Sequence, residues 1–204
     1  MKVYSGAEGS TILLIRPGAT EFDEQGRIVG TLNVPLSDLG VRQSIELAKE
    51  TSDFEIKAIF SSPSAAAIET AEIIGQHHSR KVKVKDALLN IDMGLWQGKA
   101  IDELRKNQPK VAKQWEEHPE TVCPPEGESF EDVIPRVNKF LKKLQKKQRS
   151  GTIAIVVADP LAKVIAAQLK AALEEPTAQH HPSEAVDSCG RMDLLPFEIA
   201  LADA

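Results

Sequence analysis

The sequence predicts an α/β fold: a three-layer α/β/α sandwich with a mostly parallel sheet. Short apolar runs at residues 11–15, 58–61 and 152–158 have the length and composition of buried strands. An amphipathic segment of helical length comes after each run, and strands that alternate with helices are typical of parallel sheets covered on both faces. The 204 residues, of which 42% are hydrophobic, suffice for the core of one such domain.

The first two helices are placed by their start signals. Ser37 begins a helical segment that runs to about Glu50. The apolar face of this helix is expected to hold Val41, Ile45 and Ala48. Ser62 and Pro63, a serine N-cap with proline at the first helical position, begin an alanine-rich helix that ends near Gly75.

The middle of the chain has weaker signals. Val82 and Val84 alternate with lysines, which predicts a half-exposed strand. Glycine, proline, tryptophan and charged residues are scattered over residues 86–127, with one amphipathic piece around residues 101–111. We therefore expect residues 86–127 to form a helical, cap-like insertion over the sheet edge, within a single domain of residues 1–204.

Two further helices and a last strand complete the predicted fold. Residues 128–147 are expected to form a long amphipathic helix whose apolar face holds Phe130, Val133, Val137, Phe140, Leu141 and Leu144. The same helix carries a lysine run that we interpret as a solvated face near its C-terminus: Lys142, Lys143, Lys146 and Lys147. Asp159 as N-cap and Pro160 as first helical residue begin a helix to about Leu173, and residues 192–199 are expected to form a final strand.

Composition narrows the classes of partner. The formal net charge of -5 lacks the overall positive field on which non-specific nucleic-acid binding relies. No apolar run approaches the roughly 20 residues of a membrane span. Cys123 and Cys189 lie far apart and form no metal-ligand pattern, which is typical of a reducing compartment. We expect a cytoplasmic protein with no cofactor, no metal, no nucleic acid and no membrane partner.

Distinctive residues follow three of the predicted strands. They are Arg16-Pro17-Gly18, Ser61-Ser62-Pro63 and Asp159-Pro160. The carboxyl ends of parallel strands meet at one edge of the sheet, and ligands bind there in such folds, so the site is expected at these residues. Arg16 is a candidate anion-binding residue or an ion-pair partner. Pro17 is expected to stiffen the turn, and Gly18 is expected to supply an unusual backbone angle.

The order of such residues along the chain resembles the histidine phosphatase, or phosphoglycerate mutase-like, superfamily. The resemblance extends over about residues 11 to 170, nearly the whole domain. It rests on Arg16-Pro17-Gly18-Ala19-Thr20, Gly26-Arg27, Gly30, Pro35-Leu36-Ser37, Gly40, Gln43, Ser61-Ser62-Pro63, Thr70-Ala71, Gly94, Trp96, Gly98, Pro124-Pro125-Glu126-Gly127-Glu128-Ser129 and Arg136. It implies that family's three-layer fold and a site that handles phosphate.

Four positions depart from the family's pattern where the family does its chemistry. Pro17 stands at the position of the histidine nucleophile, and its ring nitrogen is tied up in an amide. Ala66 stands at a phosphate-binding arginine, and Asn90 at the glutamate acid/base, although a carboxamide cannot shuttle protons near neutral pH. Asp159 stands at the second histidine, where a like charge about 4 Å from a phosphate costs on the order of 4 kcal/mol. Of the residues that form the family's phosphate pocket, only Arg16 is unchanged.

Smaller positions differ as well. Ala19 stands where the family usually has glutamate, and Asp23 where it often has asparagine. No catalytic position of the family is therefore intact. The candidate ligand-binding residues are Arg16, Asp23, Arg27, Asn90 and Asp159.

The leading hypothesis is a histidine phosphatase fold that has lost phosphohistidine chemistry and has a binding or regulatory role. The partner would be a protein or a small molecule, and phosphate binding would be weak or absent. One alternative is an active phosphomonoesterase or phosphomutase with a rearranged site. Another is a structural interaction module, which an exposed apolar patch or a stable homodimer surface, with the pocket closed, would favour; a homo-oligomer is one such possibility.

Several side chains carry their own hypotheses. Arg16 and Asp159 lie on strand ends that should be neighbours, so we expect the two side chains to pair and neutralise the pocket. Trp96 is interpreted as a packing anchor. The histidine pairs His77-His78 and His180-His181 are interpreted as surface residues, because adjacent residues point in different directions and form no ready metal site.

Overall fold

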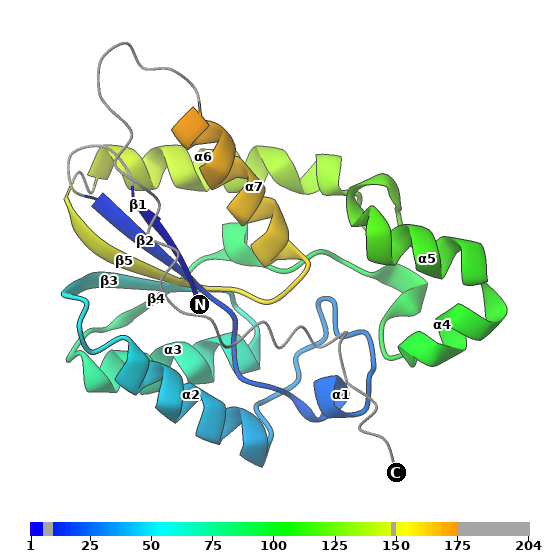
Figure 1. Cartoon of the computed structure of the whole chain (residues 1–204), viewed down its shortest axis with the longest axis horizontal. Helices are drawn as coiled ribbons and strands as arrows, with labels where there is room; N and C mark the ends of the chain where they lie inside the picture. Colours follow the sequence, from blue (N-terminus) through cyan, green and yellow to red (C-terminus); the bar gives the residue numbers. More distant parts are fainter. Residues whose placement is uncertain (6–9, 148–149, 175–204) are drawn as a thin grey trace.

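A five-stranded sheet forms the centre of the molecule. The computed structural model describes residues 1–5, 10–147 and 150–174 of the chain. The strand order is β1-β2-β5-β3-β4, and all neighbours are parallel except β1, which runs antiparallel to β2 (Figure 1). The strands are β1 (Lys2–Ser5), β2 (Ser10–Ile15), β3 (Ile56–Ser61), β4 (Val82–Val84) and β5 (Gly151–Val156).

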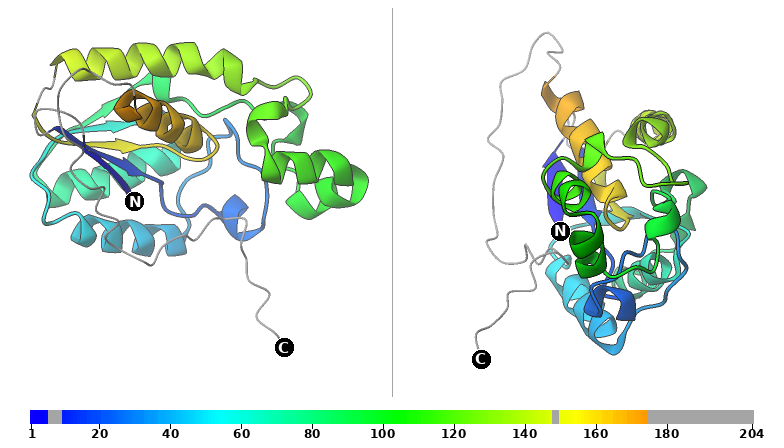
Figure 2. Two further views of the ribbon diagram at one scale, coloured as in Figure 1. Left: turned by 45° about the horizontal axis from the view of Figure 1, so that its top comes forward. Right: turned by 90° about the vertical axis from the view of Figure 1, so that its right-hand side faces the viewer.

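Helices cover both faces of the sheet, so the predicted three-layer α/β/α fold is confirmed. The helices α2 (Asp38–Glu50) and α3 (Ala65–His77) lie on one face, and α6 (Phe130–Lys147) and α7 (Leu161–Glu174) lie on the other (Figure 2). Alternate strand residues point to opposite layers: Leu13 packs with α3, whereas Leu14 packs with the residues of α6 and α7.

The insertion lies beyond the carboxyl ends of the strands, where α4 (Ile101–Asn107) and α5 (Pro109–Glu117) form one end of the molecule (Figure 1). The amphipathic piece expected at residues 101–111 is two helices, because Pro109 begins α5 and cannot continue α4. The remaining elements are short: α1 (Glu21–Glu24), η2 (Asp86–Leu88), η3 (Gly94–Trp96) and η4 (Pro119–Thr121).

The predicted start of α3 is two residues too early. The helix begins at Ala65 with Ser64 as N-cap, and the Ser64 side chain makes no capping hydrogen bond. Ser62 is still held by the sheet, because its N–H donates to the carbonyl oxygen of Val156. The turn therefore needs Pro63 and Ser64 before the helix can start.

Strand β1 was not predicted. Its segment has only one buried residue, Tyr4, and no apolar run. The strand is stabilised by its ladder with β2, in which Lys2 pairs with Leu14 and Ser5 with Thr11. Residues 192–199, expected to form a strand, and His180, His181 and Cys189 lie outside the described residues.

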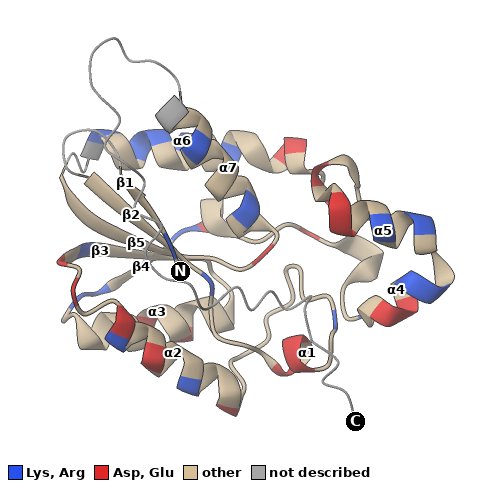
Figure 3. Ribbon diagram, in the orientation of Figure 1, with Lys and Arg blue, Asp and Glu red and all other residues tan. Residues whose placement is uncertain are grey.

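Lysine, arginine, aspartate and glutamate residues lie along the helices that cover the sheet (Figure 3). Lys142, Lys143 and Lys146 are exposed on α6, as expected for a solvated face. Among the described residues, no helix combines the length and the hydropathy of a membrane span.

The buried face of α2 differs from the expected one. Val41 and Ile45 are 38% and 43% exposed, whereas Gly40, Ser44 and Ala48 face the interior. The cause is the chain that leaves β2, because a Cβ atom on Gly40 would overlap the carbonyl oxygen of Ala19. Small residues are needed at this crossing, so the apolar residues turn outward.

Gly40→Ala is expected to destabilise the fold by about 1–3 kcal/mol, because the new methyl group meets backbone that cannot move aside. Glycine-to-alanine changes inside a helix otherwise stabilise it by up to about 1 kcal/mol. Urea unfolding measures the difference. The control is Arg42→Ala on the exposed face of the same helix, for which a change within about 0.5 kcal/mol is expected. A Gly40→Ala protein as stable as the parent would contradict the packing described.

Candidate ligand-binding site at the carboxyl ends of the strands

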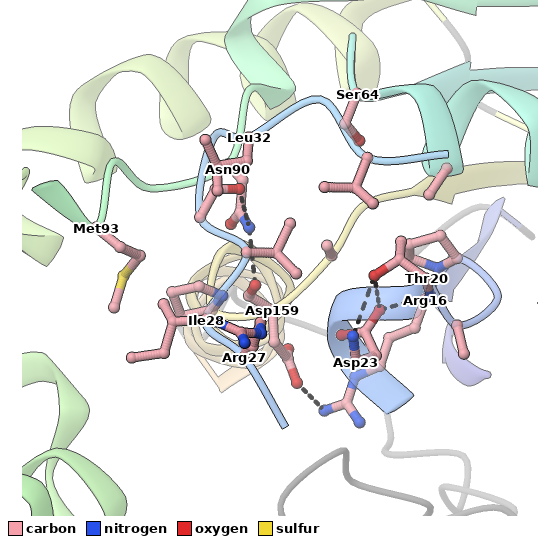
Figure 4. Close-up of a pocket in the computed structure, with 18 of the residues that line it drawn as sticks. Arg16, Thr20, Asp23, Arg27, Ile28, Leu32, Ser64, Asn90, Met93 and Asp159 are labelled. Carbon is pink, nitrogen blue, oxygen red and sulfur yellow. Dashed lines mark hydrogen bonds and ion pairs between the residues drawn. The ribbon is translucent and has the colours of Figure 1, made fainter. Parts of the chain in front are cut away.

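A cavity of about 440 Å³ opens at the carboxyl ends of β2 and β5. The loop after β2, residues 26–34, the start of α3, the start of α7 and the insertion all contribute to its lining. The candidate ligand-binding residues Arg16, Asp23, Arg27, Asn90 and Asp159 all lie in this lining (Figure 4). Pro17 and Ala66 line it as well, whereas Ser61, Ser62 and Pro63 do not. The predicted location is therefore the place where these residues meet.

Arg16 and Asp159 form an ion pair, as predicted. Nη2 of Arg16 lies 2.7 Å from Oδ2 of Asp159 (Figure 4). The two side chains come from neighbouring strand ends, because Ile15 pairs with Val156 across β2 and β5. The arginine side chain is 31% exposed and the aspartate side chain 13%, so the carboxylate is the more deeply buried partner.

Burial raises the pKa of the Asp159 carboxyl above its ordinary value of 3.8. The positive charges of Arg16, Lys163 and Lys2 oppose this shift but do not overcome it. One oxygen of Asp159 faces Arg16, whereas Oδ1 is buried without a hydrogen-bond partner among the described residues. The unpaired oxygen explains why desolvation outweighs attraction to the arginine.

Asp159 is not the N-cap of α7, which corrects the expectation from the sequence. The helix begins at Leu161, and the carboxylate of Asp159 points to Arg16 instead of to the helix N–H groups. The N–H of Leu161 donates instead to Oδ1 of Asn90, 3.2 Å away. A side chain 71 residues away in the sequence therefore caps the helix.

Asn90 is a buried structural residue in this site. Its Nδ2 donates to the carbonyl oxygens of Gly30 at 3.1 Å and of Asp159 at 2.8 Å. Its Oδ1 accepts from the N–H groups of Ile91 and Leu161. The carboxamide, 3% exposed, thus uses both its donor and its acceptor sides to join three segments of the cavity wall.

The turn after β2 is fixed by a buried polar cluster. The N–H of Gly18 donates to Oγ1 of Thr70 at 3.0 Å, and Thr70 also bonds Oγ of Ser44 at 3.0 Å. Gly18 was expected to supply an unusual backbone angle, but it is absent from the glycines with positive φ in the described chain. Glycine is needed there because a Cβ atom would overlap the carbonyl oxygen of Gly40.

Comparison with known proteins agrees with this arrangement. The family model described as the histidine phosphatase superfamily (branch 1) matches residues 12–189, which is most of the chain. The chain belongs to the histidine phosphatase superfamily. Its five-stranded, mostly parallel sheet matches solved structures of that superfamily.

Relatives in the superfamily include named phosphatases and a probable mutase. Phosphoserine phosphatase 1 of Hydrogenobacter thermophilus is 32% identical over 145 residues, which cover 71% of this chain and 69% of the relative. A bifunctional protein of Mycobacterium tuberculosis is 32% identical over 159 residues, and the match spans 75% of this chain but only 43% of that protein. A probable phosphoglycerate mutase of Escherichia coli is 29% identical over 131 residues, covering 64% of this chain and 61% of the relative.

Two solved structures of the superfamily superpose well. YhfR of Bacillus stearothermophilus gives a TM-score of 0.72 at 28% identity and covers 82% of this chain and 85% of its own. A mycobacterial glucosyl-3-phosphoglycerate phosphatase in complex with vanadate gives a TM-score of 0.72 at 26% identity, and the match covers 76% of this chain and 79% of the phosphatase. The likeness therefore includes the region that holds the cavity.

Two of the candidate ligand-binding residues, Asp23 and Arg27, form hydrogen bonds with other groups of the protein. The carboxylate of Asp23 accepts from the N–H and the hydroxyl of Thr20, which caps α1. Nη1 of Arg27 donates to the carbonyl oxygen of Gly98 at 2.8 Å, and its Nε donates to Gln25. Arg27 is exposed, so it lies at the rim of the cavity.

The apolar wall of the cavity was not predicted. It contains Ile28, Leu32, Val34, Met93, Ile101 and Trp115. These residues have no local sequence signal that distinguishes them from core residues, because apolar patterns look alike in both places. Lys163, in the first turn of α7, was also missed.

The two tryptophans have different surroundings. Trp96 is 2% exposed and packs edge-to-face against Trp115, with ring centroids 5.8 Å apart, so its predicted role as a packing anchor is confirmed. Trp115 contacts both Trp96 and Phe130 and also lines the cavity. The insertion thus joins the hydrophobic core to the site.

Histidines do not contribute to this cavity in the described part of the chain. Nε2 of His77 lies 2.8 Å from Oγ of Ser52, and Nε2 of His78 lies 2.9 Å from Oγ1 of Thr51. Both pairs join the C-terminal ends of α2 and α3. The described residues contain no group of three or more His, Cys, Asp and Glu side chains placed to hold a metal ion.

Asn90→Leu is expected to lower the free energy of unfolding by on the order of 3 kcal/mol, because the change strands buried carbonyl and N–H groups at about 1–3 kcal/mol each. Urea unfolding measures the loss. The control is Asn107→Leu at the exposed end of α4, for which a change within about 0.5 kcal/mol is expected. Equal losses in both variants would show that the carboxamide of Asn90 does not hold the site.

The raised pKa of Asp159 predicts a pH dependence of stability. As pH rises, the Asp159 carboxyl loses its proton at a lower pH in the unfolded chain than in the folded protein. Between the ordinary and the raised pKa, the folded state therefore binds more protons than the unfolded state. The free energy of unfolding of the parent should therefore fall relative to Asp159→Asn as pH rises from about 4 through the raised pKa. Urea unfolding of both proteins from about pH 4 to 7.5 measures the difference, in which other carboxyls cancel. A rise with pH would mean that Arg16 outweighs burial.

Proposed function

We propose that this member of the superfamily carries out no phosphohistidine chemistry and acts by binding a ligand in the cavity, in a regulatory or binding role. The observation that carries the proposal is the ion pair of Arg16 with Asp159 at the centre of the site. The arginine that would attract a phosphate is occupied by a carboxylate of its own chain.

The neighbouring positions support the same proposal. Pro17 has no nitrogen that can attack phosphorus, and Ala66 offers a methyl group instead of a guanidinium fork. Asn90 has both sides of its carboxamide committed to backbone groups. A leaving group in this cavity would find no proton donor at that position.

A substitute nucleophile has little support among the described residues. The hydroxyl of Thr20 donates to the carboxylate of Asp23, which caps a helix with it. Ser64 lines the cavity, but no histidine stands beside it there to act as a base. Cys123 is exposed and lies outside the lining.

Turnover of phosphate monoesters tests the proposal. We expect the purified full chain and its Arg16→Ala variant to hydrolyse p-nitrophenyl phosphate, phosphoserine and 3-phosphoglycerate at the same rate as buffer. The reason is that Pro17 offers no nucleophile and Asn90 no exchangeable proton at the two positions where the family's chemistry would need them. Phosphoserine phosphatase 1 of Hydrogenobacter thermophilus, assayed on phosphoserine in parallel, is the positive control for the assay.

Rates well above buffer that disappear in the Arg16→Ala variant would contradict the proposal. They would favour the alternative of an active phosphomonoesterase with a rearranged site. Rates above buffer that survive in Arg16→Ala would be assigned to a contaminating phosphatase and removed by further purification before the comparison is repeated.

A further inference from the structure

The cavity has the composition of a site for an uncharged organic molecule. Its walls are mostly apolar and its volume of about 440 Å³ falls in the range of small-molecule pockets. Apolar side chains from separate parts of the chain line it, among them Ile28, Leu32, Val34, Met93, Ile101 and Trp115. A phosphate ester with a small polar body would leave these walls in contact with water.

The charges in the lining do not favour an anion. Four carboxylates and three cations contribute to it: Asp23, Glu24, Glu116 and Asp159 against Arg16, Arg27 and Lys163. Glu116 is paired outward with Arg105, and Arg27 is bonded to the carbonyl oxygen of Gly98. A dianion bound at Arg16 would also be repelled by the Asp159 carboxylate, whose Oδ2 lies 2.7 Å from that guanidinium.

Arg16 retains hydrogen-bonding capacity for a ligand. Within the described residues, Arg16 makes its polar contact through Nη2, to Asp159 alone. Its Nε and Nη1 donors are left over, and the side chain is 31% exposed at the cavity floor. A neutral acceptor such as a carbonyl oxygen can take an N–H from this guanidinium without separating the ion pair.

We infer that the cavity binds a neutral, largely apolar small molecule that carries a carbonyl-type hydrogen-bond acceptor directed at Arg16. The inference rests on the proposed function, because it assigns a ligand class to the same cavity. The apolar body lies against the walls formed by residues 28–34 and the insertion. Orientation comes from the Arg16 guanidinium at the floor.

Two probes with one ring system test the ligand class. They are 2-acetonaphthone and 2-naphthyl phosphate, which share a naphthalene body and differ in a neutral carbonyl against a phosphate group. In equilibrium dialysis near neutral pH, the full chain is expected to bind the ketone with a Kd at least about tenfold lower than that of the phosphate, because the ion pair repels the dianion as well as attracting it.

Asp159→Asn removes the carboxylate and leaves Arg16 free. We expect binding of the phosphate to strengthen about tenfold relative to binding of the ketone in this variant, because the cavity loses one negative charge beside Arg16. An unchanged ratio in a folded Asp159→Asn protein would overturn the role of the ion pair in ligand choice.

A second pair of variants locates the site even if Asp159→Asn fails to fold. Leu32→Gln places an amide in the apolar wall and should weaken ketone binding by about fivefold. Leu95→Gln is the matched control, because Leu95 is 51% exposed and lies outside the lining, so binding should not change. Equal losses in both variants, or in neither, would overturn the assignment to this cavity.

The same probes separate this inference from the proposed function. If intact 2-naphthyl phosphate binds more tightly than the ketone, or if the Kd of the ketone is above about 1 mM, the proposed ligand class is wrong. Neither result would contradict the proposed function, because neither involves hydrolysis of the phosphate. Release of 2-naphthol above the buffer rate, lost in Arg16→Ala, overturns the proposed function itself. Release is followed by the fluorescence of the naphthol during the dialysis.

Discussion

The arrangement of the site depends on the carboxamide of Asn90. A side chain with both donors and acceptors can hold the carbonyl oxygens of Gly30 and Asp159 while it caps the N–H of Leu161. A glutamate in its place, ionised, has acceptors only, and would face those two carbonyl oxygens without a proton to offer. The group that holds the backbone of Asp159 has no proton to exchange near neutral pH, and its position fixes where the Asp159 carboxylate meets Arg16.

The residues of the site therefore depend on one another. Asn90 holds the backbone of Asp159, and the carboxylate of Asp159 pairs with Arg16. Changing one of them alone leaves the others unpaired: a histidine at position 159 would face Arg16 with no carboxylate between them. Such coupling is expected for polar groups that share one partially buried network, where single changes do not add.

The sequence predicted the layers, four of the five strands and the place of the site, because those follow from local apolar runs, start signals such as Ser37, and strand order. It also predicted the pairing of Arg16 and Asp159, because both follow strands that lie side by side. It missed the Asn90 cap, since the partner lies 71 residues away, and it turned α2 the wrong way, since the crossing at Ala19 is a tertiary contact. Long-range backbone contacts of this kind leave no local pattern.

The ion pair also ties the charge of the cavity floor to a single proton. With Asp159 ionised, its carboxylate compensates Arg16; with Asp159 protonated, Arg16 and Lys163 are cations without that carboxylate between them and the ligand. Burial raises the pKa of Asp159, which brings this change closer to neutral pH than an exposed aspartate would. An anion in the cavity would in turn favour the protonated carboxyl, because binding and protonation share one free energy. A neutral ligand brings no charge of its own to this equilibrium, which is why we propose that class of molecule for the Arg16 donor and the apolar walls together.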